Sequence, residues 1–300
     1  MTENHQSIGN SRGRPPLETE ENSIESANLH INGACNYDCI FCFARNLVQE
    51  TTTPDEWEPI LRSLKTNGIT KVNFAGGEPT LHPQFIQLCE LSKKIGFTVS
   101  VVTNGSKIDE RLMRRMRGCV DWIGLSVDSP ENEVEKQLGR QCKGVDHIQN
   151  VISVAKMAKE NGIKVKLNIT VVRQSWNQDF SDLIQKVSPA RVKGFQVLRI
   201  EGENDDRDDE CSITEEEWTH FVRNHEDIVL SNGERIVFEG GCDMIDSYLM
   251  LDPKGQIIKN TGNKQSFVPH SVITAGGFSA AVDVEKYHRR GAVYDWGASQ

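Results

Sequence analysis

Residues 32–43 read Asn-Gly-Ala-Cys-Asn-Tyr-Asp-Cys-Ile-Phe-Cys-Phe and contain three cysteines, Cys35, Cys39 and Cys42, in the spacing CxxxCxxC. Three thiolates on one short loop can hold an iron–sulfur cluster, whereas a four-iron cluster takes four ligands to saturate it. One iron would therefore have no protein ligand, and an open metal position is where bound molecules react. The stretch predicts a catalytic 4Fe-4S cluster held by these three cysteines.

Other uses of these cysteines are open at this point. Two of them could form half of a zinc site, although no second CxxC or HxxxH pair follows at finger spacing. They could also be buried apolar side chains, because free cysteine is among the residue types most often buried. A disulfide is disfavoured, since the chain shows no secretory signal. The five remaining cysteines have no metal-ligand spacing and are expected to be mostly structural: Cys89, Cys119, Cys142, Cys211 and Cys242.

The composition of the 300 residues, 37% hydrophobic and 26% charged, fits one large globular domain, or a domain with appendages. A formal net charge of −9 disfavours non-specific binding to nucleic acid or to an anionic membrane surface. Eight cysteines without a secretory signal indicate a reducing compartment, so we expect a cytoplasmic protein. Residues 1–25 are polar and are expected to be a disordered tail without a membrane anchor.

From Ala27 onward, apolar runs rich in β-branched residues alternate with helical patterns. The expected strands are 27–32, 70–75, 97–102, 121–127, 163–172 and 192–200. The expected helices are 54–67, 82–95, 109–117, 145–161 and 179–187. Six such units predict an α/β fold with a parallel sheet and fit a partial (β/α)6 barrel. The cysteine-bearing loop follows the first strand, so it would lie at the carboxyl ends of the strands, where α/β sites form.

We expect the barrel over residues 26–212 and a C-terminal extension over 213–300 that closes the barrel mouth. Residues 203–212 are expected to be a solvated acidic loop, because their carboxylates lack an ordered metal-ligand spacing. A further helix is predicted over 214–224, since Thr214 and a glutamate three residues later form a capping box.

A second motif, Asn73-Phe-Ala-Gly-Gly-Glu-Pro79, lies at the end of the second expected strand. Paired glycines let the backbone approach a ligand closely, and a carboxylate can accept hydrogen bonds from an ammonium group. Together with CxxxCxxC, this motif resembles the radical S-adenosylmethionine (SAM) superfamily. The resemblance implies that the free iron binds SAM through its amino and carboxylate groups, and that Gly76, Gly77 and Glu78 contact the amino group.

Further positions match the superfamily at later strand ends and in the cysteine-bearing loop. The residues that the resemblance places near the SAM ribose, carboxylate or adenine are Phe41, Asn104, Ser126, Asp128 and Arg140. Taken singly, each strand-end match could be an ordinary cap or turn. The resemblance implies that SAM on the reduced cluster is cleaved by one electron to a 5′-deoxyadenosyl radical, which takes hydrogen from an unactivated carbon. The cofactor carries that chemistry, and the protein supplies position and water exclusion.

Basic residues alternate along the fifth and sixth expected strands. Lys166 and Asn168 share one face of the fifth strand with Lys164 and Thr170, and apolar residues occupy the other face. On the sixth strand, Arg191 and Lys193 are expected to share a face with Arg199 and Glu201. A solvated face would explain such lysines, but in a barrel the polar set faces the lumen. Lys166, Asn168, Arg191 and Lys193 would then bind a polyphosphate.

The chain as a whole resembles one family, viperin and the viperin-like enzymes. The segments that carry this resemblance are residues 28–30, 35–43, 71–79, 164–168, 191–204 and 247–252. Phe-Gln-Val-Leu-Arg-Ile-Glu-Gly-Glu-Asn, residues 195–204, is far more specific than the cysteine motif. The family converts CTP to 3′-deoxy-3′,4′-didehydro-CTP, a chain-terminating antiviral nucleotide, by removing the 4′ hydrogen and losing the 3′ hydroxyl.

The resemblance also implies roles for residues outside the two strands. Asn28 and Lys71 match positions that contact the ribose or phosphates, and Lys71 could help the 3′ hydroxyl to leave. Tyr248 matches the tyrosine that delivers a proton, although it could be a packing residue. Lys264, in an amide-rich loop, could fold over the phosphates.

The chain departs from animal members of the family, which carry an N-terminal amphipathic helix and a longer, more basic C-terminal segment. These departures leave the preferred base open among CTP, UTP and GTP, as well as the role of residues 259–300. We expect a monomer that receives electrons from a flavodoxin or a reductase. Two other hypotheses are a radical SAM enzyme acting on a peptide, which would need further cysteine clusters, and a cluster-bearing scaffold, which would not need a SAM pocket.

Overall fold

The computed structural model describes residues 24–141, 144–269 and 278–289. Most of the expected disordered tail, residues 1–25, and Cys142 therefore lie outside the described residues. Ile24 is buried against the core, and the carbonyl of Glu25 accepts hydrogen bonds from the amides of Thr70 and Lys71. The last two residues of that segment thus pack onto the sheet.

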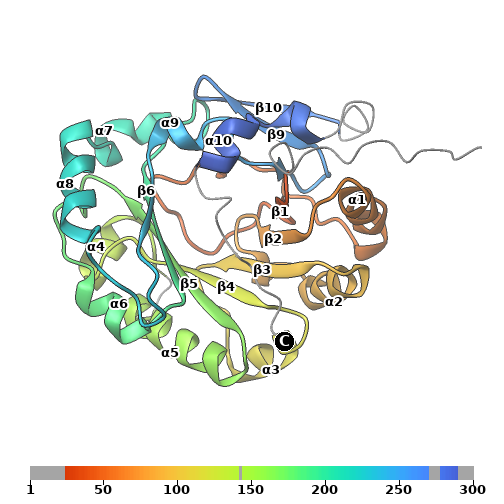
Figure 1. Cartoon of the computed structure of the whole chain (residues 1–300), viewed down its shortest axis with the longest axis horizontal. Helices are drawn as coiled ribbons and strands as arrows, with labels where there is room; N and C mark the ends of the chain where they lie inside the picture. The colour runs from red at the N-terminus through yellow and green to blue at the C-terminus, as the bar shows by residue number, and fades with distance from the viewer. Residues whose placement is uncertain (1–23, 142–143, 270–277, 290–300) are drawn as a thin grey trace, which may run out of the picture.

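Six parallel strands follow one another in a curved sheet. They are β1 (Ser26–His30), β2 (Lys71–Ala75), β3 (Thr98–Thr103), β4 (Trp122–Ser126), β5 (Lys164–Val171) and β6 (Arg191–Gln196). Figure 1 shows them as an open arc with the helices on its outer side. The predicted partial barrel is therefore confirmed, and each strand lies within a few residues of its expected range.

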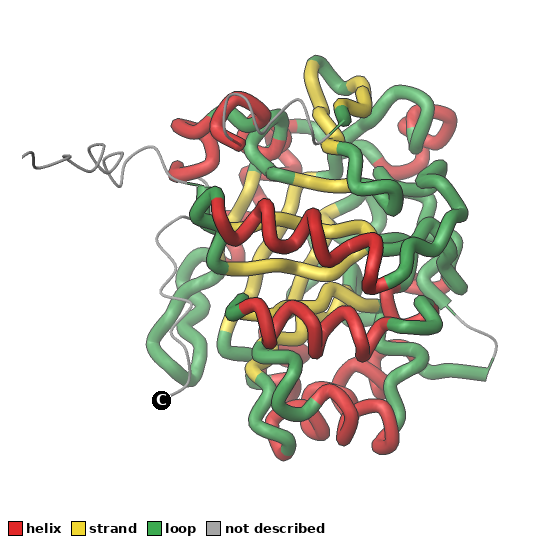
Figure 2. Tube along the Cα trace, turned by 90° about the vertical axis from the view of Figure 1, so that its right-hand side faces the viewer, coloured by secondary structure: helices red, strands yellow, loops and turns green. Residues whose placement is uncertain are grey.

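Helices connect the strands, and capping residues mark several of their ends. They are α1 (Pro54–Thr66), α2 (Phe85–Ile95), α3 (Glu110–Met116), α4 (Asn132–Gln137), α5 (His147–Glu160) and α6 (Ser181–Val187). Thr53 forms a capping box at α1, Asp109 caps α3, and left-handed Gly96 ends α2. Figure 2 shows helices lying over the outer face of the strands. The short helix α4 was not expected.

The two faces of β5 follow the predicted alternation. Val165, Leu167 and Ile169 are buried against the helices, whereas the polar residues between them are half-buried on the inner face. Strand β6 ends earlier than expected, at Gln196. Arg199 is consequently exposed and contacts Asp205 and Asp208, so the expectation that it shares the inner face with Arg191 is wrong.

The chain after β6 lengthens the same sheet at both ends. It contributes β7 (Val237–Glu239) beside β6, and β8 (Met250–Leu251), β9 (Ile257–Thr261) and β10 (Lys264–Val268) on the β1 side. Helix α8 (Glu215–His225) begins at the predicted capping box, and α9 (Gly241–Met244) and α10 (Val284–Arg289) lie between the two ends of the arc (Figure 1). The extension is thus built into the sheet. No helix in the described part is long and apolar enough to cross a membrane.

The acidic segment 203–212 is not simply a solvated loop. It forms η3 (Asp205–Arg207) and α7 (Asp208–Cys211). Asn204 is 1% exposed, and its side chain donates to the carbonyls of Phe41 at 2.9 Å and Leu198 at 3.0 Å. Glu203 is also buried and accepts a hydrogen bond from the amide of Asn46 at 2.8 Å. The expectation is wrong for these two residues, because they hold the segment that carries the cysteines.

Candidate active site

The cysteine loop, residues 32–42, leaves the carboxyl end of β1 and is attached first to the glycine motif after β2. The amide of Gly77 donates to the carbonyl of Asn32 at 2.9 Å, and the amide of Glu78 donates to the carbonyl of Ala34 at 2.7 Å. A Cβ atom on Gly77 would lie 2.2 Å from the Ala34 carbonyl oxygen. The motif needs glycine here so that the two backbones can touch.

A second attachment joins the cysteine loop to the turn after α4. The amides of Asp38 and Ile40 donate to the carbonyls of Gly139 and Leu138 at 3.1 and 3.0 Å. Gly139 has φ +76°, and a Cβ atom there would lie 1.9 Å from the Asp38 carbonyl oxygen. The cysteine loop is thus held on both sides by backbone contacts that only glycine permits.

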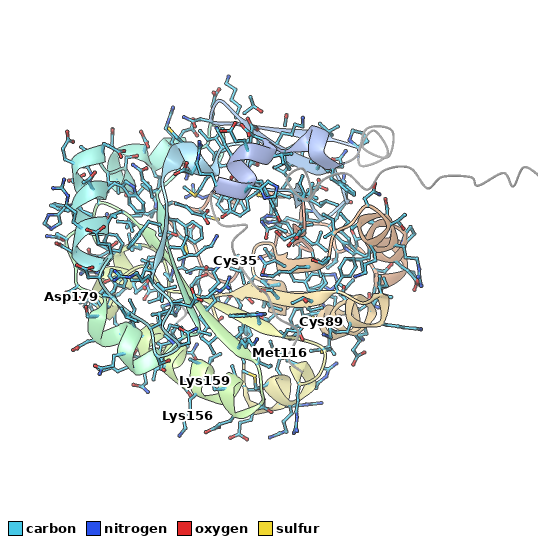
Figure 3. The ribbon with its side chains drawn as sticks, in the orientation of Figure 1. Cys35, Cys89, Met116, Lys156, Lys159 and Asp179 are labelled. Carbon is cyan, nitrogen blue, oxygen red and sulfur yellow. The ribbon has the colours of Figure 1, made fainter. Side chains whose placement is uncertain are left out.

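Cys35, labelled in Figure 3, lies within the arc. Cys35 is exposed, and Cys39 and Cys42 are half-buried. Burial raises the pKa of all three thiols, while the positive charge of Arg140 acts in the opposite direction on each. The cation therefore favours the thiolate form that metal ligation requires.

The donor set fits a cluster better than a single ion. No group of three or more His, Cys, Asp or Glu side chains in the described ranges is arranged to hold one metal ion. Ligands of one zinc ion crowd around a single centre, whereas three cysteines that hold a four-iron cluster each bind a different iron and stand farther apart.

Glu78 organises the floor of the predicted SAM site. It is 1% exposed and accepts hydrogen bonds from the Thr80 amide at 3.0 Å, the Thr103 hydroxyl at 2.7 Å and the Asn104 amide at 2.8 Å. Burial raises the pKa of Glu78, and these hydrogen bonds oppose that rise. The Asn104 side chain in turn donates to Asn36 of the cysteine loop at 3.0 Å. Glu78 and Asn104 thus connect two strand ends to the cysteines.

Asp128 and Arg140 contact each other beside the cysteine loop. Arg140 donates to one oxygen of Asp128 and lies 3.5 Å from Glu135, and the other Asp128 oxygen accepts from the Thr170 amide at 2.6 Å. The guanidinium carbon lies 5.6 Å from the centre of the Phe41 ring. Burial raises the pKa of Glu135 to about 8. The predicted carboxylate-binding arginine is therefore held in an internal ion pair.

A buried histidine near Ser126 had no sequence signal. His147 Nε2 lies 3.0 Å from the Ser126 carbonyl oxygen, and its Nδ1 lies 3.2 Å from the hydroxyl of Tyr37 in the cysteine loop. Burial is the main reason that the pKa of His147 falls to about 3, so the ring is neutral. The Ser126 carbonyl needs a donor, so Nε2 carries the hydrogen and Nδ1 accepts from Tyr37. Only the folded arrangement of α5 over β4 brings these groups together.

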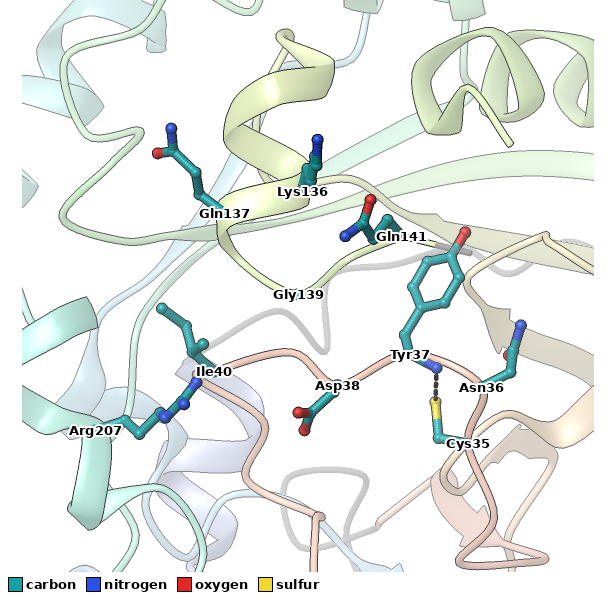
Figure 4. A pocket seen from close by; sticks show the side chains of 10 residues that line it. All are labelled: Cys35, Asn36, Tyr37, Asp38, Ile40, Lys136, Gln137, Gly139, Gln141 and Arg207. Atoms are coloured by element: carbon teal, nitrogen blue, oxygen red, sulfur yellow. Dashed lines mark hydrogen bonds between the residues drawn. The ribbon is translucent and has the colours of Figure 1, made fainter. Parts of the chain in front are cut away.

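A pocket of about 500 Å³ opens beside the cysteine loop (Figure 4). Its lining residues are Cys35, Asn36, Tyr37, Asp38, Ile40, Lys136, Gln137, Gly139, Gln141 and Arg207. None of the residues predicted to bind a polyphosphate is among them. The pocket is therefore separate from the basic cluster described next.

The pairing of β5 with β6 brings four of the predicted phosphate-binding residues together. Lys166 is opposite Arg191, and Asn168 is opposite Lys193. Arg191 and Lys193 are 8% and 5% exposed, and the amide oxygen of Asn168 is buried without a hydrogen-bond partner. Two ammonium groups, those of Lys166 and Lys193, lie 5.9 and 5.8 Å from the centre of the Phe195 ring. We call these four residues the basic cluster; its charge suits an anionic ligand.

The basic cluster and the cysteine loop belong to one lumen. Thr170 follows Asn168 on the same face of β5, and its amide binds Asp128, which in turn contacts Arg140. On the opposite side of the arc, the Asn73 side chain donates to Asn28 at 2.9 Å, and Lys71, on the same face of β2 as Asn73, is 5% exposed. Asn28 and Lys71 are thus on the inner face, as the predicted ribose contacts require.

Tyr248 joins the basic cluster through a residue that the sequence did not indicate. Its hydroxyl donates to Glu239, whose carboxylate also contacts the ammonium of Lys193. Lys264 is not brought to this cluster. Its side chain is 67% exposed and pairs with Glu201 at 2.9 Å on the β10 edge.

Comparisons with known proteins show which families this chain is similar to. The family model of the Radical SAM superfamily matches residues 29–187. The S-adenosylmethionine-dependent nucleotide dehydratase of Thermoplasmatales archaeon (strain ISO4-H5) is 48% identical over 93% of this chain and 100% of its own. A protein of the same name from Flammeovirga pacifica is 30% identical over 93% and 99% of the two chains. The RSAD2 protein of Danio rerio is 28% identical over 90% and 78%.

Solved structures support the fold. Streptococcus suis SuiB bound to S-adenosylmethionine has a TM-score of 0.64 at 18% identity, over 88% of this chain and 67% of that one. The protein anSMEcpe with bound AdoMet has a TM-score of 0.64 at 18% identity, over 89% and 82% of the two chains. At this identity the likeness concerns the fold alone.

Proposed function

Because this chain belongs to the S-adenosylmethionine-dependent nucleotide dehydratases of the radical SAM superfamily, we propose that its substrate is a nucleoside triphosphate, CTP first and UTP next. The proposed product is the 3′-deoxy-3′,4′-didehydro analogue, formed by removal of the 4′ hydrogen and loss of the 3′ hydroxyl. The observation that carries the proposal is the basic cluster on the inner faces of β5 and β6.

The basic cluster is the proposed triphosphate site. Lys166, Arg191 and Lys193 supply cationic donors, and the NH2 group of Asn168, opposite Lys193, supplies a neutral one. Their charge is concentrated on two adjacent strands of a chain whose net charge is −9. A polyphosphate can accept hydrogen bonds from several of these donors at once through its anionic oxygens, which a neutral peptide lacks.

Asn28 and Lys71 are the proposed ribose contacts. They lie on the inner faces of β1 and β2, across the arc from the basic cluster. Lys71 is buried on this inner face, so its ammonium is proposed to lie close to the ribose. A cation there would stabilise the departing 3′ hydroxyl group. Tyr248 is the proposed proton donor. Its hydroxyl contacts Glu239, and Glu239 in turn contacts Lys193. Lys264 is also a proposed phosphate contact. In this role its ammonium would leave Glu201 and bind the nucleotide instead.

The cysteine loop is the proposed cluster site, with Cys35, Cys39 and Cys42 as ligands. The cluster and SAM of the radical SAM enzymes supply one-electron chemistry that removes hydrogen from an unactivated carbon. Glu78 and the strand ends attached to it are proposed to bind the SAM amino group, with Gly76 and Gly77 beside it. Ser126 and Asp128 are proposed to contact the SAM ribose, Arg140 its carboxylate, and Phe41 its adenine.

We further propose a monomer in the cytoplasm that receives electrons from a flavodoxin or a reductase. The proposed compartment rests on the eight cysteines, which are expected to stay reduced there. Sedimentation of the purified protein tests the monomer, and reduction of its cluster by a purified flavodoxin tests the donor.

Anaerobic reconstitution with iron, sulfide, reductant and SAM tests the proposed reaction. Each nucleoside triphosphate is added in turn, and 5′-deoxyadenosine and the dehydrated nucleotide are quantified together. CTP is expected to raise both above the level without nucleotide, and UTP to do so less. If no nucleoside triphosphate raises 5′-deoxyadenosine above background, the proposal fails.

A further inference from the structure

Glu239 is a fully buried carboxylate that faces the proposed nucleotide site. It ends β7, which pairs with β6 so that Lys193 is opposite Val237 and Phe195 is opposite Glu239. Residues opposite each other on neighbouring parallel strands point to the same face, so Glu239 shares the inner face with Lys193 and Phe195. Phe238, between them, points outward and packs against Phe221. The exposed fraction of Glu239 is 0%.

The two oxygens of this carboxylate have different partners. Oε1 contacts the ammonium of Lys193, and Oε2 accepts the hydroxyl hydrogen of Tyr248. Lys193 lies on β6, near one end of the sheet, whereas Tyr248 lies two residues before β8, beyond β1 on the other side. Glu239 therefore links the two sides of the open arc at the point where the basic cluster meets the proposed proton donor.

We propose that Glu239 is a positioning residue of the dehydration reaction, which fixes the Tyr248 hydroxyl relative to the Lys193 ammonium. This inference rests on the proposed function, because it requires a nucleotide at Lys193 and a proton donor at Tyr248. An ammonium has three N–H donors, so Lys193 can keep its contact with Glu239 and still bind a phosphate oxygen. The bound triphosphate and the tyrosine hydroxyl are thereby placed with respect to the same carboxylate.

The consequence for catalysis is a separation of two steps. Removal of the 4′ hydrogen depends on the cluster side of the lumen, whereas loss of the hydroxyl as water requires a proton from a correctly placed donor and one further electron from the reductant. A misplaced Tyr248 would leave the first step intact and slow the second. Displacements of about 1 Å in an active site can cost on the order of 100-fold in rate.

Glu239→Gln is the sharpest substitution, since glutamine has nearly the same shape. Lys193 can only donate, so the amide oxygen of the glutamine would stay with its ammonium and the NH2 group would face Tyr248, whose hydroxyl then accepts and no longer donates to this side chain. In the reconstituted holoenzyme with CTP, we expect 5′-deoxyadenosine formation to stay within about threefold. The dehydrated product formed per 5′-deoxyadenosine is expected to fall about tenfold. Glu234→Gln, on an exposed glutamate of the preceding turn, is the matched control and should change neither quantity.

A double-mutant cycle tests whether Glu239 acts through Tyr248. Tyr248→Phe alone should lower the same product ratio, and adding Glu239→Gln should lower it no further. The inference is overturned if Glu239→Gln leaves the product ratio unchanged, or lowers 5′-deoxyadenosine and dehydrated product equally. It is also overturned if Glu239→Gln lowers the product ratio of Tyr248→Phe further. Should Glu239→Gln fail to fold, Glu239→Asp keeps the charge on a shorter side chain, and a smaller fall in the same ratio is expected.

A measurement without turnover separates this inference from the proposed function. The melting temperatures of Lys193→Met, Glu239→Gln and the double variant are compared with that of the parent holoenzyme. Each single change breaks a buried ion pair, so each is expected to lower the melting temperature of the parent. Once one partner has been changed, changing the other is expected to lower the melting temperature by less than it does in the parent. Additive losses would contradict the Lys193–Glu239 link. If that link is found but no nucleotide is converted by the parent enzyme, only the proposed function has failed.

Discussion

At the scale of single residues, Lys193 is held in the lumen by three neighbours on different strands. Its ammonium contacts Glu239 of β7, lies 5.8 Å from the centre of the Phe195 ring, and belongs to a residue opposite Asn168 of β5. Desolvating an unpaired charge costs on the order of several kcal/mol, so a buried lysine needs such anionic contact. Lys193 is thereby placed in the lumen by the protein itself.

Replacing Arg191 or Lys193 by alanine should weaken nucleotide binding while SAM binding persists. A charged hydrogen bond contributes about 1.5–3 kcal/mol, so the dissociation constant for CTP is expected to rise roughly 10- to 100-fold. Equilibrium dialysis of the reconstituted protein measures both ligands. Lys156→Ala, on an exposed lysine of α5, is the control and should bind both ligands as the parent does. Equal loss of CTP and SAM would contradict the assignment of these residues to the phosphates.

The basic cluster could be predicted from the sequence because its residues alternate on strands of six or more residues. Lys166 and Asn168 stand two positions apart, and the register across β5 and β6 supplies the rest. Glu239 could not be predicted in this way. Strand β7 is three residues long, too short for a period to be read, and the partners of Glu239 come from both sides of the sheet.

At the scale of elements, the cysteine loop owes its course to two contacts between backbones. The glycine motif after β2 holds residues 32–34, and the turn after α4 holds residues 38–40. The sequence suggested that the paired glycines let a ligand approach. The structure shows that Gly77 also lets one loop touch another. The role of Gly139 had no signal, because α4 is short and its turn meets the cysteine loop only in the folded chain.

Gly139→Ala should disturb the cysteine loop, whereas Gly68→Ala should not. Both glycines have left-handed φ values, +76° and +88°, so both substitutions carry a similar backbone cost of about 1 kcal/mol. Only at position 139 would the added Cβ meet another backbone, 1.9 Å from the Asp38 oxygen. The iron bound per chain after anaerobic reconstitution is expected to fall at least by half in Gly139→Ala alone. Equal iron contents in the two variants would contradict the role given to this contact.

Other elements differed from expectation because their course depends on contacts with distant parts of the chain. Strand β6 stops at Gln196, and the following residues turn back so that Asn204 can hold Phe41. An acidic composition alone indicated a solvated loop, since burial of Asn204 depends on carbonyl groups far away in the sequence. The long strands and capped helices, by contrast, are encoded by local patterns, and their positions were confirmed.

At the scale of the whole molecule, the open sheet depends on the C-terminal part of the chain. The hydroxyl of Tyr287 in α10 accepts hydrogen bonds from the amides of Glu25 and Ser26, both at 3.0 Å, at the start of β1. Tyr287 is 5% exposed and packs in the main core. The last described helix therefore fixes the first strand, from which the cysteine loop departs.

Tyr287→Phe should destabilise the protein without altering its ligand contacts. Two part-buried backbone amides would lose a partner, and each lost hydrogen bond costs about 0.5–1.5 kcal/mol. Urea unfolding followed by circular dichroism measures the free energy of unfolding. A variant as stable as the parent would contradict the proposed attachment of α10 to β1.

Stability should also decrease at mildly acid pH because His147 is buried in its neutral form. The pKa of His147 is lowered to about 3 from the ordinary 6.5, so below pH 6.5 the unfolded chain binds a proton that the folded protein does not. Its contribution is complete above pH 6.5 and is lost towards pH 3, by about 1.4 kcal/mol per pH unit. His147→Gln, which cannot ionise, should therefore lose about 1 kcal/mol less than the parent between pH 6 and pH 5. A parent and variant with equal slopes would contradict this.

In the proposed reaction, one lumen holds the nucleotide ribose within reach of the chemistry at the cysteine loop. The most direct measurement uses CTP carrying deuterium at the ribose 4′ carbon, with reconstituted enzyme, reductant and SAM, followed by mass spectrometry of the 5′-deoxyadenosine. One deuterium is expected in the 5′-deoxyadenosine, together with a dehydrated nucleotide that has lost the 4′ deuterium. Formation of 5′-deoxyadenosine without deuterium, beside dehydrated nucleotide that retains it, would contradict the account.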